Sequence, residues 1–168
     1  MNDAKPDDSD IIEKKVLAAL DSTGVPYEVV DIDPDFADTA AFCEKYGFPA
    51  EQSANSIIVA TKKKPRTYAA SVVRATHRVD VNHCVKQLMG NARVSFATAE
   101  QTRELTGMMI GGVTVLALPP GVPIFVDAGL MNHDYVILGG GSRSTKIKVS
   151  PEIFGHIPGA KIIDDLTI

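Results

Sequence analysis

The segment YVILGGGSRSTKIKV (residues 135–149) decides how the second half of the chain folds. Its apolar start, residues 135–138, predicts one strand. The alternation of lysine with isoleucine and valine over 146–149 predicts another. The three glycines between them predict a turn that joins the two strands. This part of the chain therefore favours hairpins over a strict alternation of strands and helices.

The same glycine segment is a candidate ligand site. Backbone N–H groups of Gly139, Gly140 and Gly141 can converge on an anion or a carbonyl oxygen. Arg143 and Lys146 add positive charge next to them. The segment is not a Walker A loop, because its lysine opens a strand and not a helix, so a nucleoside triphosphate is not expected. A glycine hairpin without a ligand stays the alternative.

Further hairpins are predicted on the N-terminal side of this segment. Residues 56–60 and 68–75 predict two strands, and the turn between them carries four basic residues. The apolar run 113–118 and residues 123–127 predict a second strand pair, turned at Pro119-Pro120-Gly121. Shorter predicted strands cover 27–32 and 161–164.

Helices are predicted mainly in the first two thirds of the chain. Asp10 and Glu13 fit a capping box, and apolar residues at helical spacing follow until Gly24. Three further helices, each followed by a glycine, are expected over 39–46, 81–89 and 98–105. A short helix is expected to begin at Ser150. The pattern predicts a single α+β domain with a mixed, curved, barrel-like sheet of at least six strands, flanked by helices.

Length and composition indicate one cytoplasmic domain. A chain of 168 residues, 45% hydrophobic and 23% charged, is typical of one globular unit. Residues 1–10 predict a disordered acidic tail, and residues 11–168 the folded domain. The N-terminus lacks the pattern of a signal peptide, and no apolar run predicts a membrane span. The two cysteines are expected as buried free thiols.

The charge is distributed unevenly along the chain. The formal net charge is −4, yet residues 61–93 carry eight Lys or Arg residues against a single Asp. The acidic total argues against indiscriminate binding to nucleic acid, and DNA is not an expected partner. A local basic face can still meet a polyanion.

Familiar catalytic patterns are not found in the sequence. The four histidines lack metal-ligand spacing, and no Ser or Cys has the surroundings of a nucleophile, so neither a metal nor a cofactor is expected. Gly111-Gly112 predicts a loop whose backbone approaches a ligand or another strand. Asp127 ends a predicted strand, where a role in function or in turn capping is open.

Several segments, taken in order, resemble the YbaK/ProX family of aminoacyl-tRNA deacylases, which also supplies the editing domain of bacterial prolyl-tRNA synthetases. The resemblance covers about residues 12–166 and extends across the whole predicted domain. It is carried by the segments Gly24–Tyr27, Ala54–Val59, Val94–Ala97, Thr106–Val113, Val126-Asp127 and Gly139–Val149.

The resemblance implies a pocket over the sheet and hydrolysis of the ester between a wrong amino acid and the terminal adenosine of a tRNA, typically a proline tRNA. It implies no metal. The implied partner is the acceptor end of an aminoacyl-tRNA, with prolyl-tRNA synthetase as a second candidate. The alternative is a non-catalytic relative that binds an aminoacyl-adenosine, an amino acid or a nucleotide.

Two positions depart from the family pattern. Asn55 stands where members usually carry lysine, and Val115 stands where the glycine loop usually has proline. Asn55 can donate hydrogen bonds but carries no charge, so Lys146, Arg143 or the basic hairpin is expected to compensate. Loop N–H groups are expected to stabilise the oxyanion, an effect worth ~3–4 kcal/mol per donor in known cases. The candidate catalytic residues are Gly111, Gly112, Asn55 and Asp127, and the candidate substrate-binding residues, expected around the same cavity, are Gly139, Gly140, Gly141, Ser142, Arg143 and Lys146.

Overall fold

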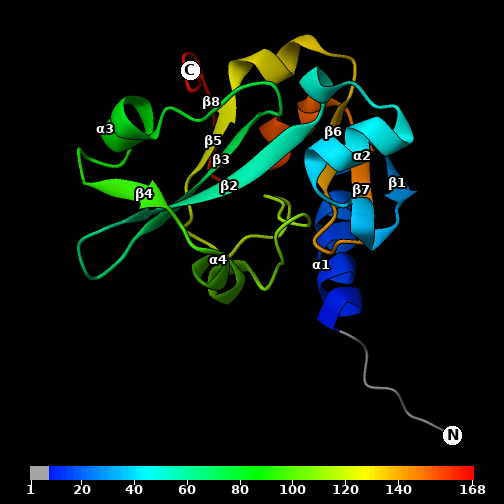
Figure 1. Cartoon of the computed structure of the whole chain (residues 1–168), viewed down its shortest axis with the longest axis horizontal. Coiled ribbons are helices and arrows are strands. Elements are labelled where there is room, and N and C mark those ends of the chain that lie inside the picture. Colours follow the sequence, from blue (N-terminus) through cyan, green and yellow to red (C-terminus); the bar gives the residue numbers. More distant parts are fainter. Residues whose placement is uncertain (1–7) are drawn as a thin grey trace, which may run out of the picture.

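Strand β2 (Ala54–Thr61) lies where the two sheets of the computed structural model meet (Figure 1). The structure describes residues 8–168. In the five-stranded sheet, β2 is antiparallel to both of its neighbours, whereas the remaining pairs are parallel, so the sheet is mixed. The order of this sheet is β4 (Val94–Phe96), β2, β3 (Tyr68–Arg74), β5 (Ile124–Asp127) and β8 (Ala160–Ile163).

The second sheet is antiparallel and consists of β1 (Tyr27–Asp31), β7 (Thr145–Val149) and β6 (Val136–Gly139), in that order. The two sheets meet through a parallel bridge between Ser53 and Ile137. β2 pairs with β4 only from Val59 onward. Within the described part of the chain, residues 54–57 therefore pair on one side only, with β3. This opening between the sheets positions the candidate site.

The helices lie around the two sheets, with α1 and α2 beside the three-stranded sheet and α3 and α4 near β4 (Figure 1). Their ends follow local sequence. In α4, Thr98 and Gln101 form a capping box, and Gly107 closes the helix with a left-handed φ of 73°. The helical elements are α1 (Asp8–Thr23), η1 (Pro34–Phe36), α2 (Thr39–Tyr46), η2 (Ala50–Gln52), η3 (Val81–Val85), α3 (Lys86–Leu88), α4 (Ala99–Thr106), η4 (Ala128–Asn132) and η5 (Pro151–His156).

The alternation of side chains along β2 and β3 divides the apolar core. Ile58 and Val72 face the larger cluster, which also holds the buried face of α1. Val59 and Val73 face a second cluster beneath η3. A third cluster surrounds Phe42 of α2. Among the described helices, none is long and apolar enough to cross a membrane.

The predicted α+β class and most predicted strands and helices are confirmed, with four corrections. The predicted tail is partly wrong, because α1 begins at Asp8 and residues 8–10 are helical; residues 1–7 lie outside the described part. The helix predicted over 81–89 is a π-helical turn followed by one short α-helical turn. The described strands form two separate sheets and no closed barrel.

The fourth correction concerns residues 113–118, which were predicted as a strand and form a loop. Val115 and Leu116 are buried in the main core, which explains their apolar character. Their backbone does not pair with a strand, because β5 occupies the place beside β3. The backbone N–H of Thr114 instead donates to Sδ of Met108. The apolar residues of this segment therefore indicate burial in the core and not pairing in a sheet.

The loop at 111–113 packs backbone to backbone on the turn between β6 and β7. The N–H of Gly141 donates to the carbonyl oxygen of Gly112 at 2.8 Å. A Cβ atom at Gly112 would lie 2.5 Å from the carbonyl oxygen of Ser142, and one at Gly139 would clash with the carbonyl oxygen of Val113. Both glycines are thus required by contact with another segment of backbone.

We expect Gly112→Ala to destabilise the protein by about 1–3 kcal/mol, because the methyl group meets backbone that cannot move aside cheaply. Gly155→Ala is the matched control, since a Cβ there has no neighbour within 4 Å. Urea unfolding of both variants measures the difference. Equal stability of the two variants would contradict this packing.

Candidate active site

A cavity of about 410 Å³ occupies the opening between the two sheets. It joins the first turn of α2, the unpaired start of β2, the glycine loop and the beginning of β7. These segments are far apart in the sequence, so the cavity is a product of the tertiary fold. Its lining residues are Asp38, Thr39, Ala40, Ala54, Asn55, Ser56, Ile57, Ile58, Ala97, Thr102, Ile110, Gly111, Val113, Gly139 and Lys146.

Four of the sequence-predicted site residues line this cavity: Asn55, Gly111, Gly139 and Lys146. Gly112 and Gly140 lie next to them in the chain but do not line it. The other candidates lie elsewhere. A larger groove of about 1000 Å³, between α1 and the loop that follows α4, is lined by Gly141, Ser142 and Arg143.

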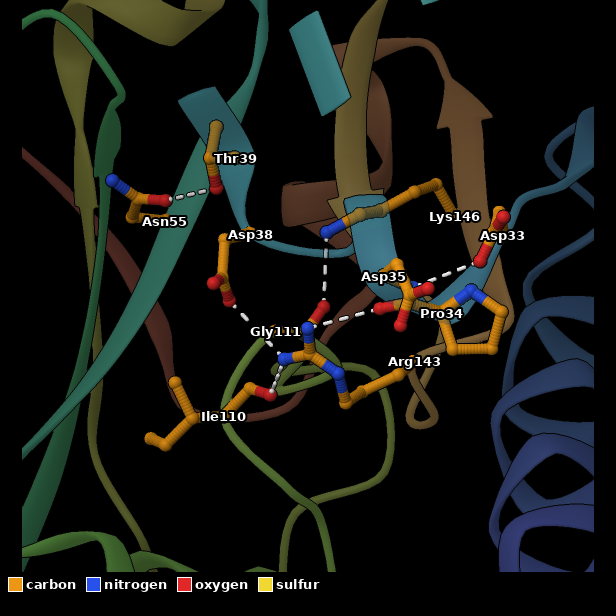
Figure 2. Close-up of polar contacts among 10 residues, drawn as sticks. All are labelled: Asp33, Pro34, Asp35, Asp38, Thr39, Asn55, Ile110, Gly111, Arg143 and Lys146. Atoms are coloured by element: carbon orange, nitrogen blue, oxygen red, sulfur yellow. Dashed lines mark hydrogen bonds and ion pairs between the residues drawn. The ribbon is translucent and has the colours of Figure 1, made fainter. Parts of the chain in front are cut away.

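We favour the smaller cavity as the candidate site because it contains Lys146, a buried cation. Only 6% of the residue is exposed, and its Nζ donates to the carbonyl oxygen of Gly111 at 3.0 Å (Figure 2). The same Nζ lies 5.5 Å from the centre of the Phe42 ring. Burial lowers the pKa of Lys146 to about 8, and the charge of Asp38 opposes this shift. Lys146 is therefore a destabilised cation, a state typical of functional sites.

Arg143 holds the glycine loop in place. Its guanidinium donates to the carbonyl oxygens of Ile110 and Pro34 and to the carboxylate of Asp38, at 2.7, 2.9 and 3.1 Å (Figure 2). These contacts join the β6–β7 turn to the loop and to the segment before α2. From the sequence, Arg143 is a candidate substrate-binding residue. The structure instead gives its guanidinium three acceptors within the protein.

Asn55 lies at the free edge of β2, opposite the first residue of α2. Its Oδ1 accepts a hydrogen bond of 2.6 Å from the hydroxyl of Thr39 (Figure 2). Its Nδ2 has no acceptor among the described residues, which leaves an amide donor for a ligand. The predicted hydrogen-bonding capacity of this position is therefore present in the cavity wall.

The two loop glycines differ in the availability of their N–H groups. The N–H of Gly112 donates to the carbonyl oxygen of Met109 at 2.9 Å, so it is already used within the loop. The N–H of Gly111 has no acceptor in residues 8–168, and Gly111 lines the cavity. Gly111 is thus the loop amide that remains for an oxyanion.

The unpaired start of β2 adds polar groups that the sequence did not predict. The carbonyl of Ile58 accepts from Ala97 on the β4 side. Alternation along the strand directs the backbone N–H and C=O of Ser56 to the same side. The Ser56 hydroxyl is buried and has no partner in the described structure. The short apolar segment that forms β4 is the sequence feature that could have indicated this edge, because a strand of this length cannot pair with the whole of β2.

Asp127 does not belong to the cavity. Its carboxylate accepts from Nε of Arg74 at 2.8 Å and from the backbone N–H groups of Arg74 and Gly129 at 3.1 and 2.9 Å. Burial would raise the pKa of Asp127, but these hydrogen bonds hold it below its usual value. Asp127 therefore has the capping role that the sequence left open as an alternative. Its carboxylate links the start of η4 to the end of β3.

Ser142 and the neighbouring turn also serve the fold. The hydroxyl of Ser142 donates to the carboxylate of Glu13 and so ties the β6–β7 turn to α1. A Cβ atom at Gly140 would clash with Thr145, so close packing excludes a side chain at this position. In the described part of the chain, no cluster of His, Cys, Asp and Glu is arranged to hold a metal ion.

Comparison with known proteins identifies the family. Residues 33–154 match the aminoacyl-tRNA editing domain, and the chain belongs to this family. A similar fold is found in a crystal structure of a hypothetical protein, APE2540, with 26% identity and a TM-score of 0.81, covering 92% of this chain and 99% of that chain. A crystal structure provisionally described as a trans-editing enzyme for prolyl tRNA synthetase has 24% identity and a TM-score of 0.78, covering 91% and 95%.

These comparisons confirm the family and the fold that the resemblance implied. The YbaK/ProX-type domain extends over most of the chain. The family defines an aminoacyl-tRNA as the class of substrate.

Replacing Lys146 with methionine should change how stability depends on pH. The ammonium is protonated in the unfolded chain up to its ordinary pKa of 10.5, but only up to about 8 when folded. Between these values the unfolded chain binds more protons, so the wild-type protein gains up to about 3 kcal/mol of unfolding free energy as pH rises. Lys146→Met lacks this gain.

Urea unfolding at pH 7 and pH 10 measures the effect as the difference between the two proteins. At pH 7 the methionine variant should be at least as stable as the wild type, because it no longer buries a cation. Parallel pH profiles for the two proteins would contradict the burial of a charged Lys146.

Proposed function

We propose that the chain is a trans-acting deacylase that hydrolyses the ester of a misacylated tRNA within the cavity between the sheets. Family membership supports the substrate class. The observation that carries the proposal is the buried ammonium of Lys146 beside the loop at Gly111. A buried cation and an N–H donor at one cavity favour the negative charge that develops on an ester carbonyl.

In the proposed reaction, water adds to the carbonyl carbon of the ester. The carbonyl oxygen becomes an oxyanion near the Gly111 N–H and the Lys146 ammonium. Collapse of this intermediate breaks the bond to the ribose oxygen, which leaves with the proton that the attacking water gives up. The products are the free amino acid and the unacylated RNA. The ester is already activated, so the site needs no covalent nucleophile.

Other cavity residues have proposed roles in orientation. The Ser56 carbonyl and hydroxyl are suited to the α-amino group of the substrate, and the Nδ2 of Asn55 is suited to a ribose hydroxyl. Proline tRNA is the first substrate to test, because the resemblance to prolyl-tRNA editing domains favours it. Prolyl-tRNA synthetase is the matching candidate partner.

Deacylation of a panel of misacylated tRNAs tests the proposal. The wild-type protein should hydrolyse at least one of them faster than buffer, and Lys146→Met should lose on the order of 10²-fold in rate, as is typical for removal of one oxyanion donor. Lys14→Ala removes an exposed lysine of α1 and serves as the control. The rate relative to buffer should fall as pH rises through about 8, where Lys146 loses its proton.

No hydrolysis of any tRNA in the panel would favour the non-catalytic relative that only binds an aminoacyl-adenosine, an amino acid or a nucleotide. Unchanged turnover by Lys146→Met would remove Lys146 from the proposed role.

A second variant tests whether a lysine at another position of the cavity wall can replace Lys146. Asn55→Lys restores the residue that the family usually has, and Asn55 and Lys146 line the same cavity. In the Lys146→Met background, Asn55→Lys should therefore recover part of the lost deacylation rate. Asn55→Gln, which adds length without charge, is the matched control. Equal rates for the two double variants would show that charge at this position does not matter.

A further inference from the structure

A second groove, of about 710 Å³, lies next to the cavity. Asn55 and Ile57 line both, so the groove and the cavity adjoin at the free edge of β2. The groove runs between the surface of β2 and β4 and the segment that precedes η3. The two strands present Ile57, Val94 and Phe96 to it, and the segment before η3 contributes His77, Arg78 and Asp80.

Phe96 is the exposed aromatic residue of this groove. It is 54% exposed, and its ring takes part in none of the aromatic pairs found among the described residues. Phe96 lies opposite Val59 in the register of β4 and β2, so it shares a sheet face with Asn55 and Ile57. A ring in this position is a platform on which a base can stack.

The groove is also basic. Lys62 and Arg78 line it, and neither side chain has a hydrogen-bond or ion-pair partner in the described part of the chain. Asp80 carries the acidic side chain among the lining residues, and it already accepts from the backbone and ring of His83. Ile168, the last residue of the given sequence, also lines the groove. Lys62 and Arg78 both come from the segment 61–93, which carries eight Lys or Arg residues and one Asp.

We propose that this groove binds the single-stranded 3′ end of an RNA. One base stacks on Phe96, and Lys62 and Arg78 contact phosphates. The terminal nucleotide passes Asn55 into the cavity. The seven-residue step from Asn55 to Lys62 spans roughly 23 Å of strand, enough for a few extended nucleotides. The inference rests on the proposed function, because it supplies the path by which that substrate reaches the site.

Fluorescence anisotropy with an uncharged RNA hairpin tests the groove without any chemistry. One hairpin carries a four-nucleotide single-stranded 3′ end, and the other is blunt. Phe96→Ala should weaken binding of the first hairpin about 5- to 150-fold, and Phe96→Tyr should retain binding, because stacking contributes about 1–3 kcal/mol per base. Leu88→Ala removes an exposed apolar side chain of α3 and is the control.

The charges are tested by the salt dependence of the same binding. Lys62→Ala and Arg78→Ala should each lower the slope of log K against log salt by about 0.7, as expected for one lost phosphate contact on a single strand. Lys14→Ala should leave the slope unchanged. The inference is overturned if both hairpins bind equally, if Phe96→Ala binds like the wild type, or if a polyglutamate peptide competes as well as the RNA does.

A minimal substrate separates this inference from the proposed function. Phe96→Ala should hydrolyse an aminoacyl ester of adenosine alone at the wild-type rate, since that substrate does not reach the groove. It should hydrolyse the full aminoacyl-tRNA with a raised KM. Binding that depends on the 3′ overhang and on Phe96, without hydrolysis of either ester, would support the groove and reject the deacylase. Equal impairment on both esters would reject the groove.

Discussion

The close packing of two backbone segments, the 111–113 loop and the β6–β7 turn, is the constraint on which the site depends. Gly112 contacts Ser142, Gly139 contacts Val113, and the Gly141 N–H donates to Gly112. Because side chains are excluded from this contact, the carbonyl of Gly111 comes within 3.0 Å of the Lys146 ammonium. The glycines therefore serve packing first, and the cavity is a consequence of that packing.

A second constraint is the cation buried at this contact. Within the described structure, no carboxylate lies within ion-pair distance of Lys146, and its ammonium is held by one carbonyl oxygen and the face of Phe42. Neither contact fully offsets the loss of water, which explains the lowered pKa. The buried ammonium therefore lowers the free energy of unfolding of the protein. This supports the proposal that Lys146 on β7 takes the role of the lysine that the resemblance implies at the position of Asn55.

Much of the fold could be predicted from sequence because its signals are local. The capping box of α4, the glycine that ends α2 and the two apolar runs joined by a basic turn in the hairpin of β2 and β3 need no distant information. The errors arose where partners are distant in sequence. Residues 113–118 were misjudged because burial in a loop and burial in a strand give the same apolar pattern. The acceptors of Arg143 and the role of Asp127 could not be deduced, because Pro34 and Arg74 lie far from them in the chain.

The central claim is that the ester is bound between the two sheets, at Gly111 and Lys146. The most direct measurement is a crystal structure with an adenosine analogue whose amino acid is attached through a stable 3′ amide. We expect the amide carbonyl oxygen within hydrogen-bond distance of the Gly111 N–H and the Lys146 ammonium, with the adenine toward Asn55. An analogue bound instead in the larger groove between α1 and the loop after α4, or one that leaves the cavity empty at saturating concentration, would contradict it.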